Sequence, residues 1–236
     1  MQTRFLVDET SDIFSEVPRH TVAKDRVYSV LRRRILFDDI HPKEKLSETT
    51  LASQFGVSRT PVREAIARLL DDELVIAIPQ SGTYVAPISL EKADEATYLR
   101  EIVEPTITRT AASRATSEHL AQLETLIEAH SNSYRNDEYA ESFTRDIEFH
   151  RLAYLICGNE RIWRSLNRLS SDSYRVRFLK LKTHYRWEAT YAEHVHILEC
   201  FEQRRLDELE AAIRQHIHKC YEDHQILQDN YPGYFA

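Results

Sequence analysis

The segment Leu51–Leu70 constrains this chain more than any other stretch of its sequence. Ser47 and Thr49 can cap a short helix that ends at Phe55, and Gly56 supplies the tight turn that follows it. A second helix is predicted from about Pro61, because a proline in the first turn of a helix loses no hydrogen bond. The order of helix, tight turn and helix indicates a helix-turn-helix.

The N-terminal end of the second predicted helix carries groups that suit a DNA groove. They are the guanidinium groups of Arg59 and Arg63 and the hydroxyl groups of Ser58 and Thr60. The planar fork of arginine matches O6 and N7 of guanine or a phosphate, and hydroxyls at the positive end of a helix suit phosphate oxygens. An ordinary helical hairpin with a solvated arginine face is the alternative that this pattern alone leaves open.

Two short runs typical of strands follow the second helix. Leu74–Ile78 is apolar, Pro79–Gly82 has turn chemistry, and Thr83–Val85 is again rich in residues that favour strands. A two-stranded hairpin directly after a helix-turn-helix is the wing of a winged helix. The predicted wing therefore favours the DNA-binding interpretation over an ordinary helical hairpin.

The stretch from Val27 to Val85 resembles the winged-helix domain of GntR-type bacterial transcription regulators. The resemblance lies in PKEKLSETTLASQFGVSRTPVREAIARLLDDELV and PQSGTYV, of which the VSRTPVREA core is highly specific. It implies contacts with double-stranded operator DNA, to which we assign Thr49, Ser58, Arg59, Thr60, Arg63, Ser81 and Gly82. Some members have an arginine where this chain has Thr49, so a base contact at that position stays open.

The distribution of charge agrees with a local DNA-binding surface. The chain carries a net charge of −7. Residues 19–70 nevertheless hold 11 Lys and Arg against 6 Asp and Glu, a balance of +5, whereas residues 89–236 hold 19 against 25, a balance of −6. The excess of basic residues therefore lies where it would meet phosphate.

Cysteine usage and hydropathy bear on the compartment. The three cysteines are widely spaced and no CxxC pair exists, which argues against a disulfide framework and for a reducing compartment. The N-terminal residues lack the basic start and apolar core of a signal peptide, and no segment approaches the roughly 20 apolar residues that span a bilayer. We expect a cytoplasmic protein with no membrane partner.

The chain divides into three expected segments. They are an N-terminal arm at 1–20, a winged-helix DNA-binding domain at 21–87, and an all-helical effector-binding and dimerisation domain at 88–236. After Pro87 only helical patterns follow, with breaks that give about six helices. The expected fold is mainly α, with a small two-stranded wing in the first domain.

Four polar residues of the helical part share helix faces with apolar side chains. Asp146 and His150 are separated by one helical turn and therefore lie on one face of a helix. Because that face is apolar, both side chains should point into the domain. Arg205, in a polar break, lies midway between His194 and His216, so two antiparallel helices would set these imidazoles level. The pair His196 and His218 has the same spacing but more polar neighbours, and is the rival pair.

A carboxylate and three neutral imidazoles suit a borderline divalent ion such as Zn²⁺ or Ni²⁺. A polar cavity held together by hydrogen bonds without metal is the alternative. LREIVEPTITRTAA, RDIEFHRLAYLICGN and AEHVHIL…AAIRQHI also resemble the FCD-type effector domain of the FadR branch of GntR regulators. This resemblance implies a metal held by an aspartate and three histidines, which it assigns to Asp146, His150, His194 and His216.

The same resemblance implies a homodimer and a small organic acid that binds the metal through a carboxylate. Arg100 is the predicted second anchor for this effector, although it could instead pair with Glu104 one helical turn away. Arg186 and Tyr191 are weaker candidates for contacts with the effector.

The sequence therefore predicts a ligand-responsive transcription regulator, with repression as the expected response. The same regulator with a metal-free cavity for an acyl ligand is one alternative. A metal-dependent hydrolase with an appended DNA-binding domain is another, but no motif for a general base or nucleophile accompanies the cluster. We therefore expect no enzymatic activity.

Overall fold

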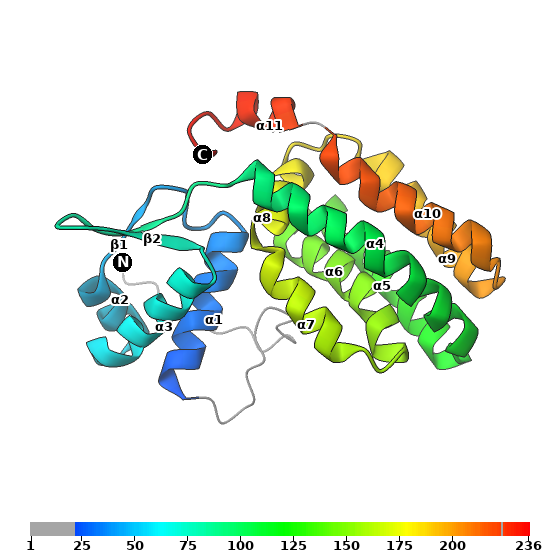
Figure 1. The fold of residues 1–236 in the computed structure, drawn as a ribbon, viewed down its shortest axis with the longest axis horizontal. Helices are drawn as coiled ribbons and strands as arrows, with labels where there is room; N and C mark the ends of the chain where they lie inside the picture. The colour runs from blue at the N-terminus through cyan, green and yellow to red at the C-terminus, as the bar shows by residue number, and fades with distance from the viewer. Residues whose placement is uncertain (1–21, 223) are drawn as a thin grey trace. The chain divides into compact units, whose positions relative to one another are not determined.

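The computed structural model describes residues 22–222 and 224–236, so the predicted arm at 1–20 lies outside the described residues. The described part of the chain forms two units. One contains the residues up to Ser89 together with Tyr231–Ala236, and the other is Leu90–Asn230. Figure 1 shows the helices and strands of each unit.

The first unit is a winged helix. Its elements, in chain order, are α1 (Ala23–Leu36), β1 (Lys45–Leu46), α2 (Glu48–Phe55), α3 (Arg59–Asp71), β2 (Val75–Ile78) and β3 (Gly82–Val85). The antiparallel sheet has the strand order β1-β3-β2, so the predicted hairpin is present and β1 adds a third strand to it. The register pairs Val75 with Val85 and Ile78 with Gly82.

Local sequence explains the helix-turn-helix. The Ser47 hydroxyl accepts a hydrogen bond from the backbone N–H of Thr50 at 3.3 Å, which caps α2. Gly56 ends α2 with a φ of 65°, in the left-handed region that glycine adopts without strain. The facing sides of α1 and α3 form the core of the unit, with the buried side chains Val27, Leu31, Ile35, Val62, Ile66 and Leu69.

The last residues of the chain belong to the first unit, unlike the expected boundary at 88–236. The backbone N–H of Ile88 donates to the carbonyl of Tyr234 at 2.8 Å, and the N–H of Ala236 donates back to Ile88 at 3.0 Å. These residues also form an isolated parallel bridge between Ile88 and Phe235. Backbone pairing between segments so far apart in sequence leaves no local pattern that could have been seen.

The second unit is all-helical. Its helices are α4 (Leu90–Arg114), α5 (Ser117–Arg135), α6 (Tyr139–Ile156), α7 (Glu160–Leu169), α8 (Ser171–Lys182), α9 (Trp187–Glu202), α10 (Leu206–His218), a 3₁₀ turn (Lys219–Tyr221) and α11 (His224–Asn230). The most extensive contacts are those of α5 with α6 and of α4 with α10 (Figure 1). The mainly α fold class is confirmed, with seven helices up to His218 where about six were expected. Within the described ranges, no helix has the length and apolar character needed to cross a membrane.

Helix α4 continues through Pro105. A proline has no backbone N–H and leaves the carbonyl one turn earlier, that of Glu101, without its helical partner. Nη1 of Arg214, on α10, donates to this carbonyl at 3.0 Å. This hydrogen bond satisfies the free carbonyl oxygen of Glu101. It also connects α4 to α10, the helix that carries His216.

Candidate metal centre and nucleic-acid interface

All seven residues predicted to contact DNA lie exposed on the winged helix. Arg59 and Arg63 extend from the start of α3, and their side chains are 59% and 67% exposed. Ser81 and Gly82 lie at the tip of the β2–β3 hairpin. Gly82 has a φ of 134°, a backbone conformation that residues with a side chain rarely adopt, so the wing tip favours glycine.

Sequence analysis missed Glu48, which joins the two arginines. This residue of α2 accepts hydrogen bonds from Arg59 at 3.0 Å and from Arg63 at 3.2 and 3.3 Å. The bonds from Arg63 and Arg59 lower the pKa of the Glu48 carboxyl. An acidic residue in the first turn of the preceding helix was the available signal. The carboxylate holds both guanidinium groups beside one another at the face that would meet DNA.

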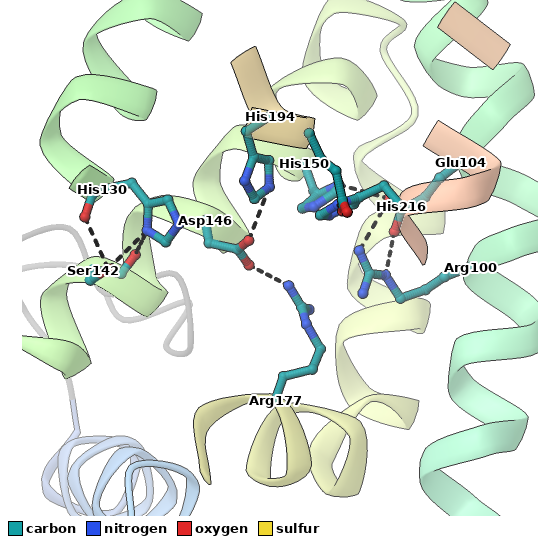
Figure 2. Close-up of polar contacts among 10 residues, drawn as sticks. Arg100, Glu104, His130, Ser142, Asp146, His150, Arg177, His194 and His216 are labelled. Atoms are coloured by element: carbon teal, nitrogen blue, oxygen red, sulfur yellow. Dashed lines mark hydrogen bonds and ion pairs between the residues drawn. The ribbon is translucent and has the colours of Figure 1, made fainter. Parts of the chain in front are cut away.

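The second unit brings together the four predicted metal ligands. Asp146 and His150 come from α6, His194 from α9 and His216 from α10, and all four are buried. One ligand atom from each lies within 4.8 Å of the others. Figure 2 shows the side chains pointing toward a common centre.

The ring geometry separates these histidines from the rival pair. The ring centroid of His216 lies 4.5 Å from that of His194 and 5.4 Å from that of His150. The side chains of His196 and His218 are 46% and 64% exposed instead, and they face glutamates at the surface. The antiparallel arrangement of α9 and α10 thus sets His194 and His216 level inside the unit.

Two carboxylates, one buried and one half-buried, orient the histidine rings, and sequence analysis gave neither a role at the metal centre. Nδ1 of His150 lies 2.9 Å from Oε2 of Glu104, and Nδ1 of His216 lies 2.8 Å from Oε2 of Glu193. A carboxylate on Nδ1 favours the tautomer whose Nε2 lone pair is free to bind a metal. Arg100 supports Glu104 through a 2.6 Å bond, and Lys219 supports Glu193.

The unpaired ring nitrogens test whether the cluster fits a metal. Nε2 of His150 and both ring nitrogens of His194 are buried and have no hydrogen-bond partner. Nε2 of His194 does lie 3.2 Å from Oδ1 of Asp146, but the contact lacks hydrogen-bond alignment. Buried polar atoms without partners are costly, and a divalent cation would accept one lone pair from each ring, the second nitrogen of His194 carrying the proton. The donor set fits Zn²⁺ or Ni²⁺.

The charge states also suit metal binding. Burial lowers the pKa of His150, and it lowers that of His216 to about 3, so both rings are neutral ligands at neutral pH. Burial alone would raise the pKa of the Asp146 carboxyl. The charge of Arg177 and contacts with the histidines outweigh burial and hold this pKa well below its usual range.

A cavity of about 80 Å³ adjoins the cluster. Among its lining residues are Asp146, His216 and the cationic side chains of Arg177, Lys180 and Lys219. Arg177, on α8, forms an ion pair with Asp146. Sequence analysis missed Arg177, although it lies one helical turn after the buried residue Tyr174 on α8.

The three predicted effector contacts do not line this cavity. Arg100 is buried in the pair with Glu104, which was the alternative left open for it. Arg186 forms an ion pair with Glu222 at the surface. The ring of Tyr191 stacks on that of Trp187, with 6.0 Å between the ring centroids. Spacing along one helix could not reveal which cations face a cavity formed by several helices.

His130 of α5 is a further buried residue beside the cluster. Its ring lies 5.4 Å from that of His194, and it lines the same cavity. Burial lowers its pKa to about 4. Its spacing from the buried residues Leu123 and Ile127 placed it on the inner face of α5 and was the signal that sequence analysis did not use.

The winged helix with exposed arginines on its second helix, joined to an all-helical unit, defines the class of winged-helix DNA-binding regulators. Residues 23–85 match the family described as "Bacterial regulatory proteins, gntR family", and residues 95–219 match the FCD domain. The chain belongs to the GntR family of bacterial regulatory proteins and carries an FCD domain.

Individual relatives agree with this assignment. The chain is 31% identical over 206 residues to the HTH-type transcriptional repressor RspR of Escherichia coli (strain K12), covering 87% of this chain and 90% of that protein. It is 29% identical over 192 residues to the HTH-type transcriptional repressor NanR of Salmonella newport (strain SL254), covering 72% and 73%. The structure of E. coli McbR/YncC has a similar fold, with a TM-score of 0.76, 18% identity and coverage of 89% and 99%.

The protein is therefore a DNA-binding transcription regulator and not an enzyme. The predicted GntR assignment is confirmed, and operator DNA is its partner. Assignment to the FadR branch stays a prediction.

Proposed function

We propose that this regulator represses transcription as a homodimer and responds to a small organic acid bound at a divalent metal in its FCD domain. One observation carries the proposal, the convergence of Asp146, His150, His194 and His216 on a buried centre. Four protein ligands leave positions open on an octahedral ion such as Ni²⁺, and Zn²⁺ can expand its coordination, so the ion supplies a site for a carboxylate.

The cations of the adjoining cavity support an anionic effector. Arg177 already pairs with the carboxylate of Asp146, and its fork can bind a second carboxylate in the same way. Lys180 and Lys219 add positive charge to the lining of the cavity. We therefore propose Arg177 as the second anchor of the effector, in place of Arg100, Arg186 and Tyr191.

Repression and dimerisation rest on other grounds. RspR and NanR are both named repressors. A dimer would place two winged helices on two operator half-sites, and an effector that binds better to one arrangement of the dimer would change its affinity for DNA. On this account Ser58, Arg59, Thr60 and Arg63 contact one half-site, with Ser81 and Gly82 near the minor groove and Thr49 beside them.

Operator binding should respond to carboxylates only while the metal centre is intact. We expect zinc-loaded protein to bind DNA from upstream of its own gene in the tens-of-nanomolar range. A carboxylate that acts as the effector should weaken this binding to DNA by about 5- to 100-fold. The measurement is an electrophoretic shift titrated with a panel of small organic acids.

The control is Asp146→Ala, which should bind the same DNA but lose the response to acid. Absence of a specific shift would overturn the operator assignment. An unchanged response in Asp146→Ala would remove the metal from the mechanism and favour the metal-free cavity.

A further inference from the structure

The proposed metal and its cationic surroundings leave one buried polar group of the cavity without a role. This group is the ring of His130, which is 4% exposed. The ring lies between Trp187, at a centroid distance of 4.9 Å, and His194, at 5.4 Å. It is therefore held beside the metal-ligand cluster by packing on two sides.

Hydrogen bonds fix the tautomer of His130. Nδ1 lies 2.8 Å from the carbonyl oxygen of Ser142 and 2.9 Å from its hydroxyl oxygen. A carbonyl oxygen only accepts, so Nδ1 carries the proton and donates it. The Ser142 hydroxyl donates in turn to the carbonyl of His130 at 3.0 Å. In the neutral ring Nε2 is then an acceptor.

The Nε2 atom of His130 is buried and has no hydrogen-bond partner. Figure 2 shows the ring with one nitrogen toward Ser142 and the other turned toward Asp146 and His194. His130 lines the cavity together with Asp146, Arg177 and His216. An acceptor fixed in this position calls for a donor on the molecule that fills the cavity.

The chemistry of the lining then defines that molecule. The proposed metal and the cations Arg177, Lys180 and Lys219 bind acceptors, which a carboxylate supplies. His130 binds a donor, which a carboxylate lacks. The volume of about 80 Å³ corresponds to about six water positions at roughly 10–15 Å³ each, which suits an acid of few atoms.

We infer that His130 accepts a hydrogen bond from a hydroxyl group of the effector, so that the effector is a small hydroxycarboxylate and not an unsubstituted acid. This inference rests on the proposed function and deepens it. On this account His130 contacts the effector and determines specificity. It does not bind the metal, whose ligands are Asp146, His150, His194 and His216.

Matched pairs of acids test the role of His130. Calorimetric titration of the zinc-loaded full chain with lactate and propionate, and with malate and succinate, compares acids that differ by one hydroxyl group. We expect the wild type to prefer the hydroxy acid of a pair by about three- to tenfold, the value of one neutral hydrogen bond.

Two variants of the same residue separate ligand contact from structure. His130→Asn keeps a donor toward Ser142 but removes the acceptor at the position of Nε2, and should bind both acids of a pair equally. His130→Gln places an amide oxygen near the position of Nε2 and should retain part of the preference. Both variants should keep the zinc content of the wild type.

The outcomes distinguish this inference from the proposed function. Equal binding of both acids by the wild type, or an undiminished preference in His130→Asn, would overturn the role of His130 while the metal-bound carboxylate stands. Loss of zinc from both variants would show that the residue is structural and would also overturn it. If no acid of either pair binds the zinc-loaded wild type, the proposed function fails and this subsite fails with it.

Discussion

Replacing Arg63 by alanine weakens binding of the protein to its operator by about 10- to 100-fold, the range expected for a bidentate arginine contact to a base. Arg63 lies in the first turns of α3 with a side chain that is 67% exposed, and Glu48 holds its guanidinium beside that of Arg59. The substitution leaves the packed face of α3 intact. Fluorescence anisotropy with a labelled operator duplex at fixed salt measures the effect.

Arg135→Ala is the matched control, because it removes the same charge from an exposed residue at the end of α5. It should change the affinity for operator DNA by less than about twofold. Metal content should be the same in both variants. Equal affinities of Arg63→Ala and the wild type would contradict the assignment of α3 as the recognition helix.

Replacing Glu104 by alanine destabilises the helical unit by about 3–5 kcal/mol, the usual cost of removing one partner from a buried ion pair. Glu104 is 2% exposed and accepts a 2.6 Å bond from Arg100, which is 4% exposed. Burial alone would raise the pKa of Glu104, but the charges and bonds of Arg100 and His150 hold it well below its usual range. The substitution leaves a buried guanidinium without its counter-charge.

Thermal unfolding measures this effect, and we expect Tm to fall by about 10 °C. Zinc affinity should also fall by about 10- to 100-fold, because Glu104 orients His150. Asp207→Ala is the control. It breaks an ion pair with Arg109 in which the Asp207 side chain is 96% exposed, and should leave Tm unchanged.

A double variant distinguishes the buried charge from loss of packing. Arg100→Met with Glu104→Gln removes both charges and keeps an amide oxygen for Nδ1 of His150, so it should recover most of the stability. A Glu104→Ala protein as stable as Asp207→Ala would contradict the account of this pair.

Most of the winged helix could be predicted because its determinants are local. Ser47 caps α2 and Gly56 ends it, and these residues act within one turn of the chain. Strand β1 could not be predicted, because a strand of 2 residues has no alternation to detect. The break between α7 and α8 falls at Ser170, where neither glycine nor proline interrupts the helical pattern.

The candidate metal ligands could also be found from periodicity. One helical turn separates Asp146 from His150, and the fold-back of α9 on α10 aligns His194 with His216. The groups around them could not be found in this way. Glu104, Arg177 and His130 come from three other helices, and helix periodicity gives the inner face of a helix without its neighbours.

Elemental analysis of protein purified without a histidine tag or chelator tests the central claim most directly. We expect close to one zinc or nickel ion per chain in the wild type, and its loss in both Asp146→Ala and His216→Ala. His196→Ala, from the exposed rival pair, should keep the metal. A wild type without metal even after reconstitution with Zn²⁺ or Ni²⁺, or variants that keep it, would contradict the metal centre.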